Sequence, residues 1–386
     1  MKKLCILFFL LLSVLTFSDT QDIDFNNIID NSLGQQINVG ITRFQASTLY
    51  VRVQGGNAYL KAGQTYTTLQ EGTTFTLTAN GAQVVYNGKS YSQIYLVKSS
   101  VLTLIGLSKD GRTFSRYRGD FDFLNEGGTV MPIDTITTEE YLYSVVPSEI
   151  GTSFPNEAIK AQAVAARSYL YYNLEHSKYR NYDIKDSTDS QMYLGYDREN
   201  KNVNSCVNAT TNQVMLYNGQ PIQAFFSSDA GPFTADSLYV WGTSTPYLKA
   251  IDDSAFQGYS PKPIWSYSLS YANLSAMFGF KVTSIQILGK NNGRVIKVLI
   301  HGTYPKTLTG QQFRQKIGYT NLKSTYFDIS STSQGVTFTG RGFGHGVGMS
   351  QWGAYGMAKQ GYTYKQILQH YYSNITIQAI NNWKNL

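Results

Sequence analysis

The chain has 386 residues and a formal net charge of +7, with 42% hydrophobic and 15% charged residues. This length suffices for one large domain or two joined domains with a substantial core. The few charges and the many aromatic residues exclude an intrinsically disordered chain. The basic residues form no dense cluster, so nucleic acid is not expected as a partner, and the mild excess of base suits an anionic cell-surface partner.

The first residues have the pattern of an export signal. Met1-Lys2-Lys3 is followed by an apolar run over residues 4–15 and then by small and polar residues. The run is shorter than the roughly 20 residues that span a membrane as a helix, so we predict a signal peptide at residues 1–18. A short uncleaved N-terminal anchor is the alternative. Either one predicts an exported protein of the cell envelope or the extracellular space.

The next part of the chain is predicted to be rich in strands. Residues 19–35 are polar and read as a linker. Short segments that alternate apolar and polar residues follow, among them 37–41 and 49–53, with Gly- and Asn-containing turns between them. We therefore expect a β-rich N-terminal module at residues 36–130.

Two helices are predicted after this module. Thr137-x-x-Glu140 has the pattern of a capping box that opens a helix, and Pro147 is expected to end it. Pro155 is expected to start the second helix. The apolar residues of that helix fall three or four positions apart and form one stripe. They are Ile159, Ala163, Ala166, Leu170 and Leu174.

The remaining residues predict strands and loops at 203–330, then a Gly-rich segment, then two short helices. The first of these helices covers residues 350–359, and Thr363 with Gln366 caps the second. This order of elements predicts an α+β fold. A mixed helix and strand core at residues 131–375, which holds the binding cleft, joins the β-rich module, and residues 376–386 form a C-terminal tail.

The Gly-rich segment at residues 340–353 is the first candidate for a functional site. Glycine alternates with other residues from Gly340 to Gly348, and no Gly-Lys-Ser/Thr follows, which excludes a Walker loop. A Gly-rich edge strand with bulges is the structural alternative. The glycines frame His345, and Ser350, Gln351 and Trp352 follow. Such a segment lets a ligand reach the backbone while polar and aromatic side chains bind it, as a sugar polymer requires.

The second candidate is Glu149 in the segment Pro147-Ser148-Glu149-Ile150-Gly151. We expect a turn just past a helix end. One interpretation is an ordinary solvated glutamate. The other is a carboxylate in a partly dry cleft, with its pKa raised into the range of a general acid.

The four histidines form no His-Glu-x-x-His pattern, and Cys206 is the one cysteine outside the predicted signal peptide. We therefore predict no metal and no cofactor.

The two candidates together resemble the SpoIID/LytB family of bacterial cell-wall proteins, which includes stage II sporulation protein D and amidase enhancers. The similar segments follow the order of the family and cover residues 36–373. They are Glu140-Tyr141-Leu142, Val145-Val146-Pro147-Ser148-Glu149, residues 154–169, Gln191-x-Tyr193-x-Gly195, residues 224–228, Val240-Trp241-Gly242, residues 342–353 and residues 364–372.

The resemblance implies peptidoglycan as the substrate and places Glu149 where the family has its catalytic glutamate. Some members hold zinc through one His and two Cys near the Gln-x-Tyr-x-Gly motif, but residues 186–191 contain neither residue type. The usual Ser-Gly-Gly-x-Thr of the family is replaced by Asp229-Ala-Gly-Pro-Phe-Thr234. This departure predicts a reshaped loop.

The resemblance thus implies a lytic transglycosylase that acts on glycan strands stripped of their peptides, with Glu149 expected as the general acid and base. The alternatives are a glycan-binding protein that enhances an amidase without cleaving bonds, and a hydrolytic muramidase. For Arg167 a structural role competes with glycan binding. The candidate substrate-binding residues are Arg167, Gln191, Tyr193, His345, Gly346, Ser350, Gln351 and Trp352.

Overall fold

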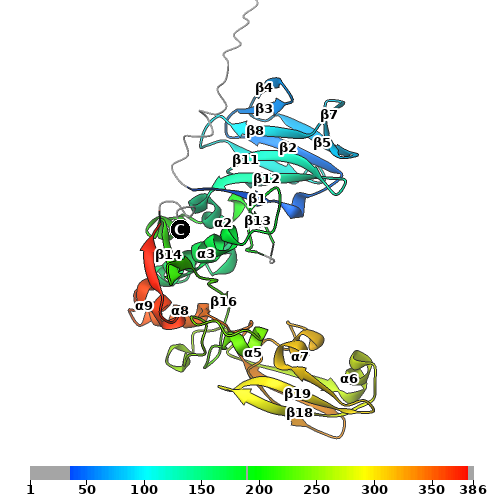
Figure 1. Ribbon diagram of the computed structural model, residues 1–386, viewed down its shortest axis with the longest axis vertical. Helices are drawn as coiled ribbons and strands as arrows, with labels where there is room; N and C mark the ends of the chain where they lie inside the picture. The colour runs from blue at the N-terminus through cyan, green and yellow to red at the C-terminus, as the bar shows by residue number, and fades with distance from the viewer. Residues whose placement is uncertain (1–34, 188–189, 381–386) are drawn as a thin grey trace, which may run out of the picture. The chain divides into compact units, whose positions relative to one another are not determined.

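The computed structural model describes residues 35–187 and 190–380 (Figure 1). The predicted signal peptide, nearly all of the predicted linker and the end of the predicted tail lie outside these residues. The chain divides between Leu33 and Gly34 into two units, and every described residue belongs to the second. Among the described helices, none is long and apolar enough to cross a membrane.

Two sheets form the front of the described chain, as the alternating pattern predicts. In β2, Leu49, Val51 and Val53 are buried while the residues between them are more exposed, which confirms the period of two. The first sheet has the order β13(Ile184–Lys185), β1(Gln36–Gly40), β12(Thr129–Thr137), β11(Asp120–Glu126), β8(Gln93–Lys98), β3(Ala58–Ala62), β4(Thr65–Leu69). The second has the order β10(Ser115–Tyr117), β9(Leu104–Ser108), β2(Thr48–Gln54), β5(Thr74–Asn80), β6(Gln83–Tyr86), β7(Lys89–Tyr91).

Helix α2(Thr138–Glu149) follows β12 directly. The Oγ1 atom of Thr137 accepts the Glu140 N–H at 3.3 Å, so the predicted N-cap is confirmed. The expectation that Pro147 ends the helix is wrong, because α2 continues through Glu149. Pro147 cannot donate a helical N–H bond, but the helix continues past it, and the Ile150 N–H donates to the Val146 carbonyl at 3.0 Å.

Helix α3(Asn156–Glu175) carries the predicted apolar stripe, and all five residues of that stripe are buried. Pro155 is the N-cap, one position before the first helical residue. Alanines on the same helix, among them Ala161 and Ala165, are also fully buried. Their small side chains let the neighbouring helices and strands approach α3 closely, which makes α3 the central element of the larger core.

The last third of the chain returns to this core. The elements that complete it are α4(Lys201–Asn208), β14(Gln213–Tyr217), β15(Gln220–Pro221), β16(Phe226–Ser227), α5(Ser237–Trp241), β23(Met349–Ser350), α8(Gln351–Lys359), α9(Tyr364–Tyr371) and β24(Thr376–Ala379). Residues from Ile37 to Ile380 share one hydrophobic cluster. The predicted boundary after residue 130 falls within β12, whose buried residues join the front sheets to the helices.

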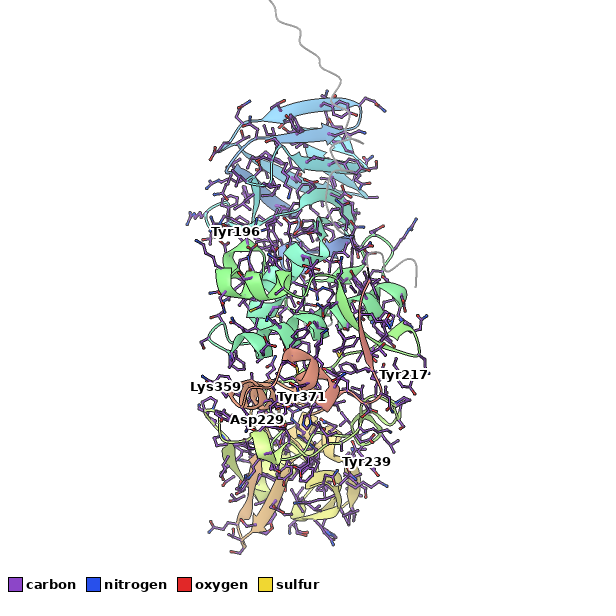
Figure 2. The ribbon with its side chains drawn as sticks, turned by 90° about the vertical axis from the view of Figure 1, so that its left-hand side faces the viewer. Tyr196, Tyr217, Asp229, Tyr239, Lys359 and Tyr371 are labelled. Atoms are coloured by element: carbon purple, nitrogen blue, oxygen red, sulfur yellow. The ribbon has the colours of Figure 1, made fainter. Side chains whose placement is uncertain are left out.

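A separate core forms between Trp265 and Phe338. Its elements are β17(Ile264–Ser270), α6(Tyr271–Phe278), β18(Val282–Asn291), β19(Arg294–Gly302), β20(Lys306–Thr309), α7(Gly310–Ile317), β21(Phe327–Ser331) and β22(Gly335–Arg341). The prediction of strands and loops alone at residues 203–330 is wrong, because α4, α5, α6 and α7 lie there in whole or in part. The α+β class is confirmed. Asp229 and Tyr371, both labelled in Figure 2, are buried.

Candidate functional site

The Gly-rich segment is a loop rather than an edge strand. Strand β22 ends at Arg341, and Gly342, Gly344, Gly346 and Gly348 all have positive φ, from 70° to 121°. Only glycine adopts this repeated left-handed backbone readily. The loop packs tightly on residues 225–231, since a Cβ at Gly348 would lie 2.0 Å from the Phe225 carbonyl oxygen. The glycines therefore fix the course of the loop and the direction of His345.

His345 is half-buried on this loop and is neutral near pH 7. Its Nδ1 accepts the Val347 N–H at 3.0 Å, which leaves the proton of the neutral ring on Nε2. Burial, together with the guanidinium groups of Arg294 and Arg314, lowers the pKa of His345 to about 4. The ring centroid lies 5.4 Å from that of Trp241. A neutral imidazole suits hydrogen bonding to an uncharged ligand rather than charge neutralisation.

Glu149 is the last residue of α2. The prediction placed it in a turn just past the helix end, so the helix is longer than predicted. Its Oε1 atom accepts the Met192 N–H at 3.2 Å. Its backbone carbonyl accepts Nε2–H of Gln351 at 2.9 Å, across 202 residues of sequence. Burial raises the pKa of the Glu149 carboxyl group, and the hydrogen bond from Met192 opposes this rise. The result is a carboxylic acid that holds its proton to a higher pH than a solvated glutamate.

A pocket of about 320 Å³ brings the two candidates together. Glu149 and His345 both line it, although the sequence separates them widely. Gln191 also contributes to its wall. Aromatic side chains supply much of the remaining surface. The other lining residues are Tyr169, Ser190, Met192, Ala224, Phe225, Phe226 and Trp241.

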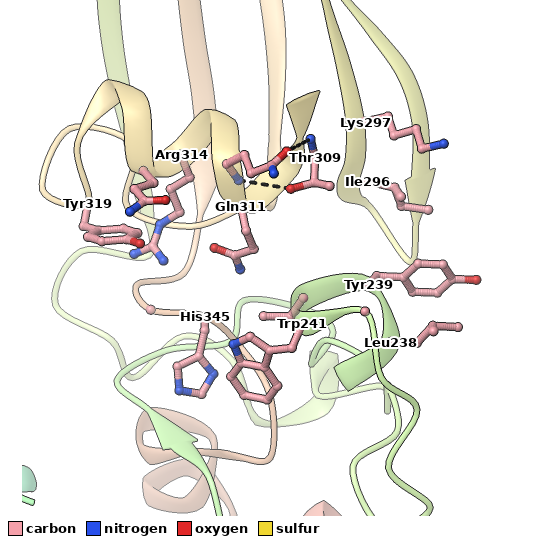
Figure 3. A pocket seen from close by; sticks show the side chains of 15 residues that line it. Leu238, Tyr239, Trp241, Ile296, Lys297, Thr309, Gln311, Arg314, Tyr319 and His345 are labelled. Atoms are coloured by element: carbon pink, nitrogen blue, oxygen red, sulfur yellow. Dashed lines mark hydrogen bonds between the residues drawn. The ribbon is translucent and has the colours of Figure 1, made fainter. Parts of the chain in front are cut away.

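A second pocket of about 1,100 Å³ shares two lining residues, Trp241 and His345, with the first. Figure 3 shows the two rings next to each other at its base, with Gln311 pointing toward them from α7 and the Arg314 guanidinium group beside the Tyr319 ring. Phe225, Phe226 and Trp241 were not predicted as site residues. Residues 224–228 and 239–242, where aromatic residues stand next to small ones, could have indicated them.

Two of the predicted binding residues sit deep in the protein. Gln191 is 2% exposed, and its Oε1 atom accepts the Tyr141 hydroxyl at 3.3 Å. Tyr193 is 1% exposed, and its hydroxyl donates to Asp134 at 2.7 Å. The side chain of Tyr193 is thus part of the core below the pocket, where it supports the segment that carries Met192.

Arg167 is also buried, in an ion pair. Its Nη2 donates to Glu139 at 2.6 Å and its Nη1 to the Gln213 carbonyl at 3.0 Å. These contacts join α3 to α2 and β14. Arg167 lines neither of the pockets that His345 lines, and its surroundings match the structural alternative.

Ser350 and Gln351 act on the backbone around the site. The Ser350 hydroxyl accepts the Gly353 N–H at 3.2 Å and caps α8. It also accepts the Ala230 N–H at 3.1 Å, which ties the loop at residues 229–234 to the helix. Gln351 holds the carbonyl of Glu149, as described above. Both residues therefore position the site rather than line the pocket.

Gly346 and Trp352 face the protein rather than the pockets. A Cβ at Gly346 would lie 2.3 Å from Nη2 of Arg294, so a larger residue would strike this buried guanidinium group. The Trp352 ring packs at 4.7 Å from Phe154 and 5.2 Å from Tyr355, measured between centroids. Trp352 is thus partly buried in an aromatic cluster at the edge of the larger core.

The residues near Gln191 do not fit the zinc site of some family members. Asp186, the nearest described carboxylate before it in sequence, accepts the Thr42 hydroxyl at 2.6 Å and pairs with Arg43 at 3.7 Å. Within residues 35–187 and 190–380, no group of three or more His, Cys, Asp or Glu side chains is placed to hold a metal ion.

Sequence comparisons with known proteins identify the family of the chain. The family model described as "Stage II sporulation protein" matches residues 126–217, which include Glu149 and the segment of Met192. Stage II sporulation protein D of Bacillus subtilis is 32% identical over 66% of this chain and 78% of its own length. An uncharacterized protein of Brachyspira hyodysenteriae is 31% identical over 79% of this chain and 84% of its own. The amidase enhancer of Bacillus subtilis is 31% identical over 62% of this chain and 40% of its own. This degree of similarity, over more than two thirds of the Bacillus subtilis protein, means that the chain belongs to the stage II sporulation protein D family.

Proposed function

We propose that the protein is a lytic transglycosylase that cleaves the glycan strands of peptidoglycan at the cell envelope. The observation that carries this proposal is the setting of Glu149. Its carboxyl group lines a pocket, and burial raises its pKa. A glycosidic oxygen leaves readily only when an acid protonates it, and an acid with a raised pKa supplies that proton near neutral pH.

In the proposed reaction Glu149 donates its proton to the oxygen between N-acetylmuramic acid and N-acetylglucosamine. The bond from that oxygen to the anomeric carbon of muramic acid breaks, and its electron pair stays on the oxygen. The C6 hydroxyl of the same muramic acid then attacks the anomeric carbon. The Glu149 carboxylate takes the hydroxyl proton, so a 1,6-anhydro end forms and the acid is restored.

The surroundings of Glu149 support both halves of this cycle. The Met192 N–H stabilises the carboxylate that exists between the two proton transfers. Gln351 holds the backbone of Glu149 and so limits the positions that its side chain can take. Phe225, Phe226 and Trp241 give the pocket flat apolar surface, which suits the apolar faces of pyranose rings.

The test is mass analysis of the products released from peptide-stripped glycan by the wild-type protein and by Glu149→Gln. We expect anhydro ends from the wild type and a loss of about 10²–10⁴-fold in the variant, the usual contribution of general acid catalysis. Glu71→Gln is the matched control, because Glu71 is exposed on a turn of the front sheets. Reducing ends would indicate a hydrolytic muramidase instead. A Glu149→Gln variant that keeps most of the activity would show that Glu149 is not the acid.

A second candidate function is binding of glycan to enhance a cell-wall amidase, without bond cleavage. The observation in its favour is the similarity to a protein named amidase enhancer. This function needs the pocket but not the acid. It predicts that Glu149→Gln stimulates a cell-wall amidase as well as the wild type does, and that neither protein releases anhydro products.

A further inference from the structure

A third pocket, of about 450 Å³, lies between three segments of the larger core, and the proposed reaction does not use it. Tyr172 and Glu175 come from the last turn of α3, Tyr217 from the end of β14, and Tyr247 from the loop after α5. The other lining residues are His176, Gln220 and Pro221. None of the described lining residues is Lys or Arg, whereas one is a glutamate, so the wall favours a cation over an anion.

The carboxylate of Glu175 is available to such a cation. No hydrogen bond or ion pair to it occurs within residues 35–187 and 190–380. Although the residue as a whole is exposed, partial burial of the carboxyl group raises its pKa, and the neighbouring His176 opposes this rise. A bound cation would stabilise the ionised form of Glu175, which nothing else at the pocket fully does.

The end of α3 adds partial negative charge to the same wall. The helix ends at Glu175, and His176 is its C-cap. The carbonyl groups of a last helical turn lack helical partners and favour a nearby cation. The Tyr172 carbonyl accepts Nδ1–H of His176 at 2.7 Å, which leaves Nε2 of the neutral ring as an acceptor. The helix end therefore offers acceptors to a ligand that donates hydrogen bonds.

Three tyrosine rings form much of the remaining wall, and contacts within the protein hold them in place. Tyr172 stacks on His176, with the ring centroids 4.3 Å apart. The ring centroids of Tyr217, labelled in Figure 2, and Tyr247 are 5.5 Å apart. The Tyr247 hydroxyl accepts the Gln223 N–H at 3.1 Å. Aromatic faces attract cations, and they also give flat apolar surface to a sugar ring.

This pocket lies close to the pocket of Glu149. Tyr169 lines the Glu149 pocket, and Tyr172 lines the third pocket. Residues three positions apart on a helix are neighbours on one face, so the two pockets follow each other along α3. A glycan strand that is bound at Glu149 can therefore place another of its sugar units in the third pocket.

We propose that the third pocket is a subsite for an amino sugar whose 2-amino group is not acetylated. Glu175 binds the ammonium group, and the rings of Tyr172, Tyr217 and Tyr247 surround it. The inference rests on glycan being the ligand of the Glu149 pocket. Acetylation converts the ammonium group to a neutral amide and removes the charge that this wall favours. A peptide amine has the same charge, but the three ring faces suit a pyranose better than a flexible chain.

The test measures binding of three probes to protein that carries Glu149→Gln, which prevents cleavage in the proposed reaction. Two probes are peptide-stripped glycan oligomers of equal length, one fully N-acetylated and one with de-N-acetylated glucosamine units. The third is a short peptide with a free side-chain amine. We expect the de-N-acetylated oligomer to bind about tenfold more tightly than the acetylated one, as a hydrogen bond to a charged group allows, and more tightly than the peptide.

Two further substitutions locate this preference in the third pocket. Adding Glu175→Gln should remove most of it. Adding Tyr217→Leu keeps apolar volume but removes a ring face, and should reduce the preference about threefold. The matched control is Glu71→Gln, which removes the same charge from an exposed glutamate outside the pocket and should leave the preference unchanged.

Equal binding of the two oligomers would overturn the inference, as would a full preference after Glu175→Gln or after Tyr217→Leu. A loss of preference after Glu71→Gln would show a general effect of charge instead of a subsite. Tighter binding of the peptide than of either oligomer would indicate a peptide site. Cleavage by the wild type without the preference would refute the subsite alone, and the preference without cleavage by the wild type would refute the lyase alone.

Discussion

The carboxyl group of Glu149 titrates differently in the folded and the unfolded chain, because burial raises its pKa above the ordinary value of 4.5. Between the unfolded and the folded pKa, the folded state binds more protons, so the stability of the protein falls as the pH rises. Above the folded pKa the carboxylate is ionised in both states, and the loss of stability caused by burying its charge no longer changes with pH. Near neutral pH, the buried carboxylate of Glu149 therefore lowers the free energy of unfolding of the protein.

It follows that Glu149→Gln raises the melting temperature near pH 7. The amide oxygen keeps the hydrogen bond from Met192, while the charge that burial disfavours is gone. The difference from the wild type should shrink as the pH falls toward 4, where Glu149 is protonated in both states. Thermal melts at several pH values measure this, with Glu71→Gln as the reference. A variant that melts lower at pH 7 would contradict the burial argument.

In the proposed reaction the acid form of Glu149 makes the first proton transfer, so the activity of the wild type should also fall as the pH rises through the raised pKa. Rates of release of anhydro ends across the pH range measure this. The descending limb should lie above pH 4.5, the ordinary value for glutamate. A limb at or below that value would mean that a group other than Glu149 is titrating.

A substitution of Trp352 can distinguish a role in the core from a role in glycan binding. Its ring packs on Phe154 and Tyr355 and lines neither pocket. We expect Trp352→Ala to lower the free energy of unfolding by about 3 kcal/mol, at the low end for aromatic truncation because the ring is only partly buried. Glycan binding by the folded fraction should be normal. Weak binding at unchanged stability would support the sequence-based prediction that Trp352 contacts the glycan.

At the scale of elements, the ion pair of Arg167 holds three of them together. Arg167→Met takes the guanidinium donor away from the Gln213 carbonyl and from Glu139, which keeps the hydrogen bond from the Asn212 N–H. Breaking a buried pair in this way typically costs about 3–5 kcal/mol. Lys160→Met on the same helix breaks a more exposed pair, with Glu157, and should cost about 0–1 kcal/mol. Denaturant unfolding compares them, and equal effects would argue against a structural role for Arg167.

Helices were predicted correctly where a single local pattern, such as a capping box or an apolar stripe, determined them. The N-cap at Thr137, the box at Thr363 and Gln366, and the stripe of α3 all occur as expected. Helix α7 was missed although Thr309 and Gln312 form the same kind of box. Its surroundings of short strands concealed it, because the sequence does not show which core a short amphipathic segment packs against.

The candidate site could be predicted only in pieces. Glu149 and His345 each stood out from local composition, but the hydrogen bonds that join their segments are long-range. Trp241 was part of a segment that carries the family resemblance, but it was not predicted as a site residue, because the sequence does not show that it lines two pockets. Tyr193 and Arg167 looked like ligand contacts, since nothing in the sequence distinguishes a polar side chain in a core network from one in a pocket.

At the scale of the whole described chain, there are two separate hydrophobic cores. We therefore expect the two parts built around them to unfold with different free energies. The core between residues 265 and 338 includes Phe338, which is fully buried. We expect Phe338→Ala to destabilise that part by about 3–5 kcal/mol. Hydrogen exchange should then speed up in β17–β22 and remain slow in α3. Leu170→Ala, in the larger core, should have the converse effect. Uniform acceleration in either variant would indicate a single cooperative unit.

The hydrogen bond from Gln351 to the Glu149 carbonyl has a consequence for a chain that is still being made. A ribosome must add 202 residues after Glu149 before its partner exists. His345 joins the same pocket only a few residues earlier. A nascent chain can thus fold its front sheets while its acid remains unanchored. The pocket that Glu149 and His345 line is among the last features to mature, and an incomplete polypeptide carries no finished one.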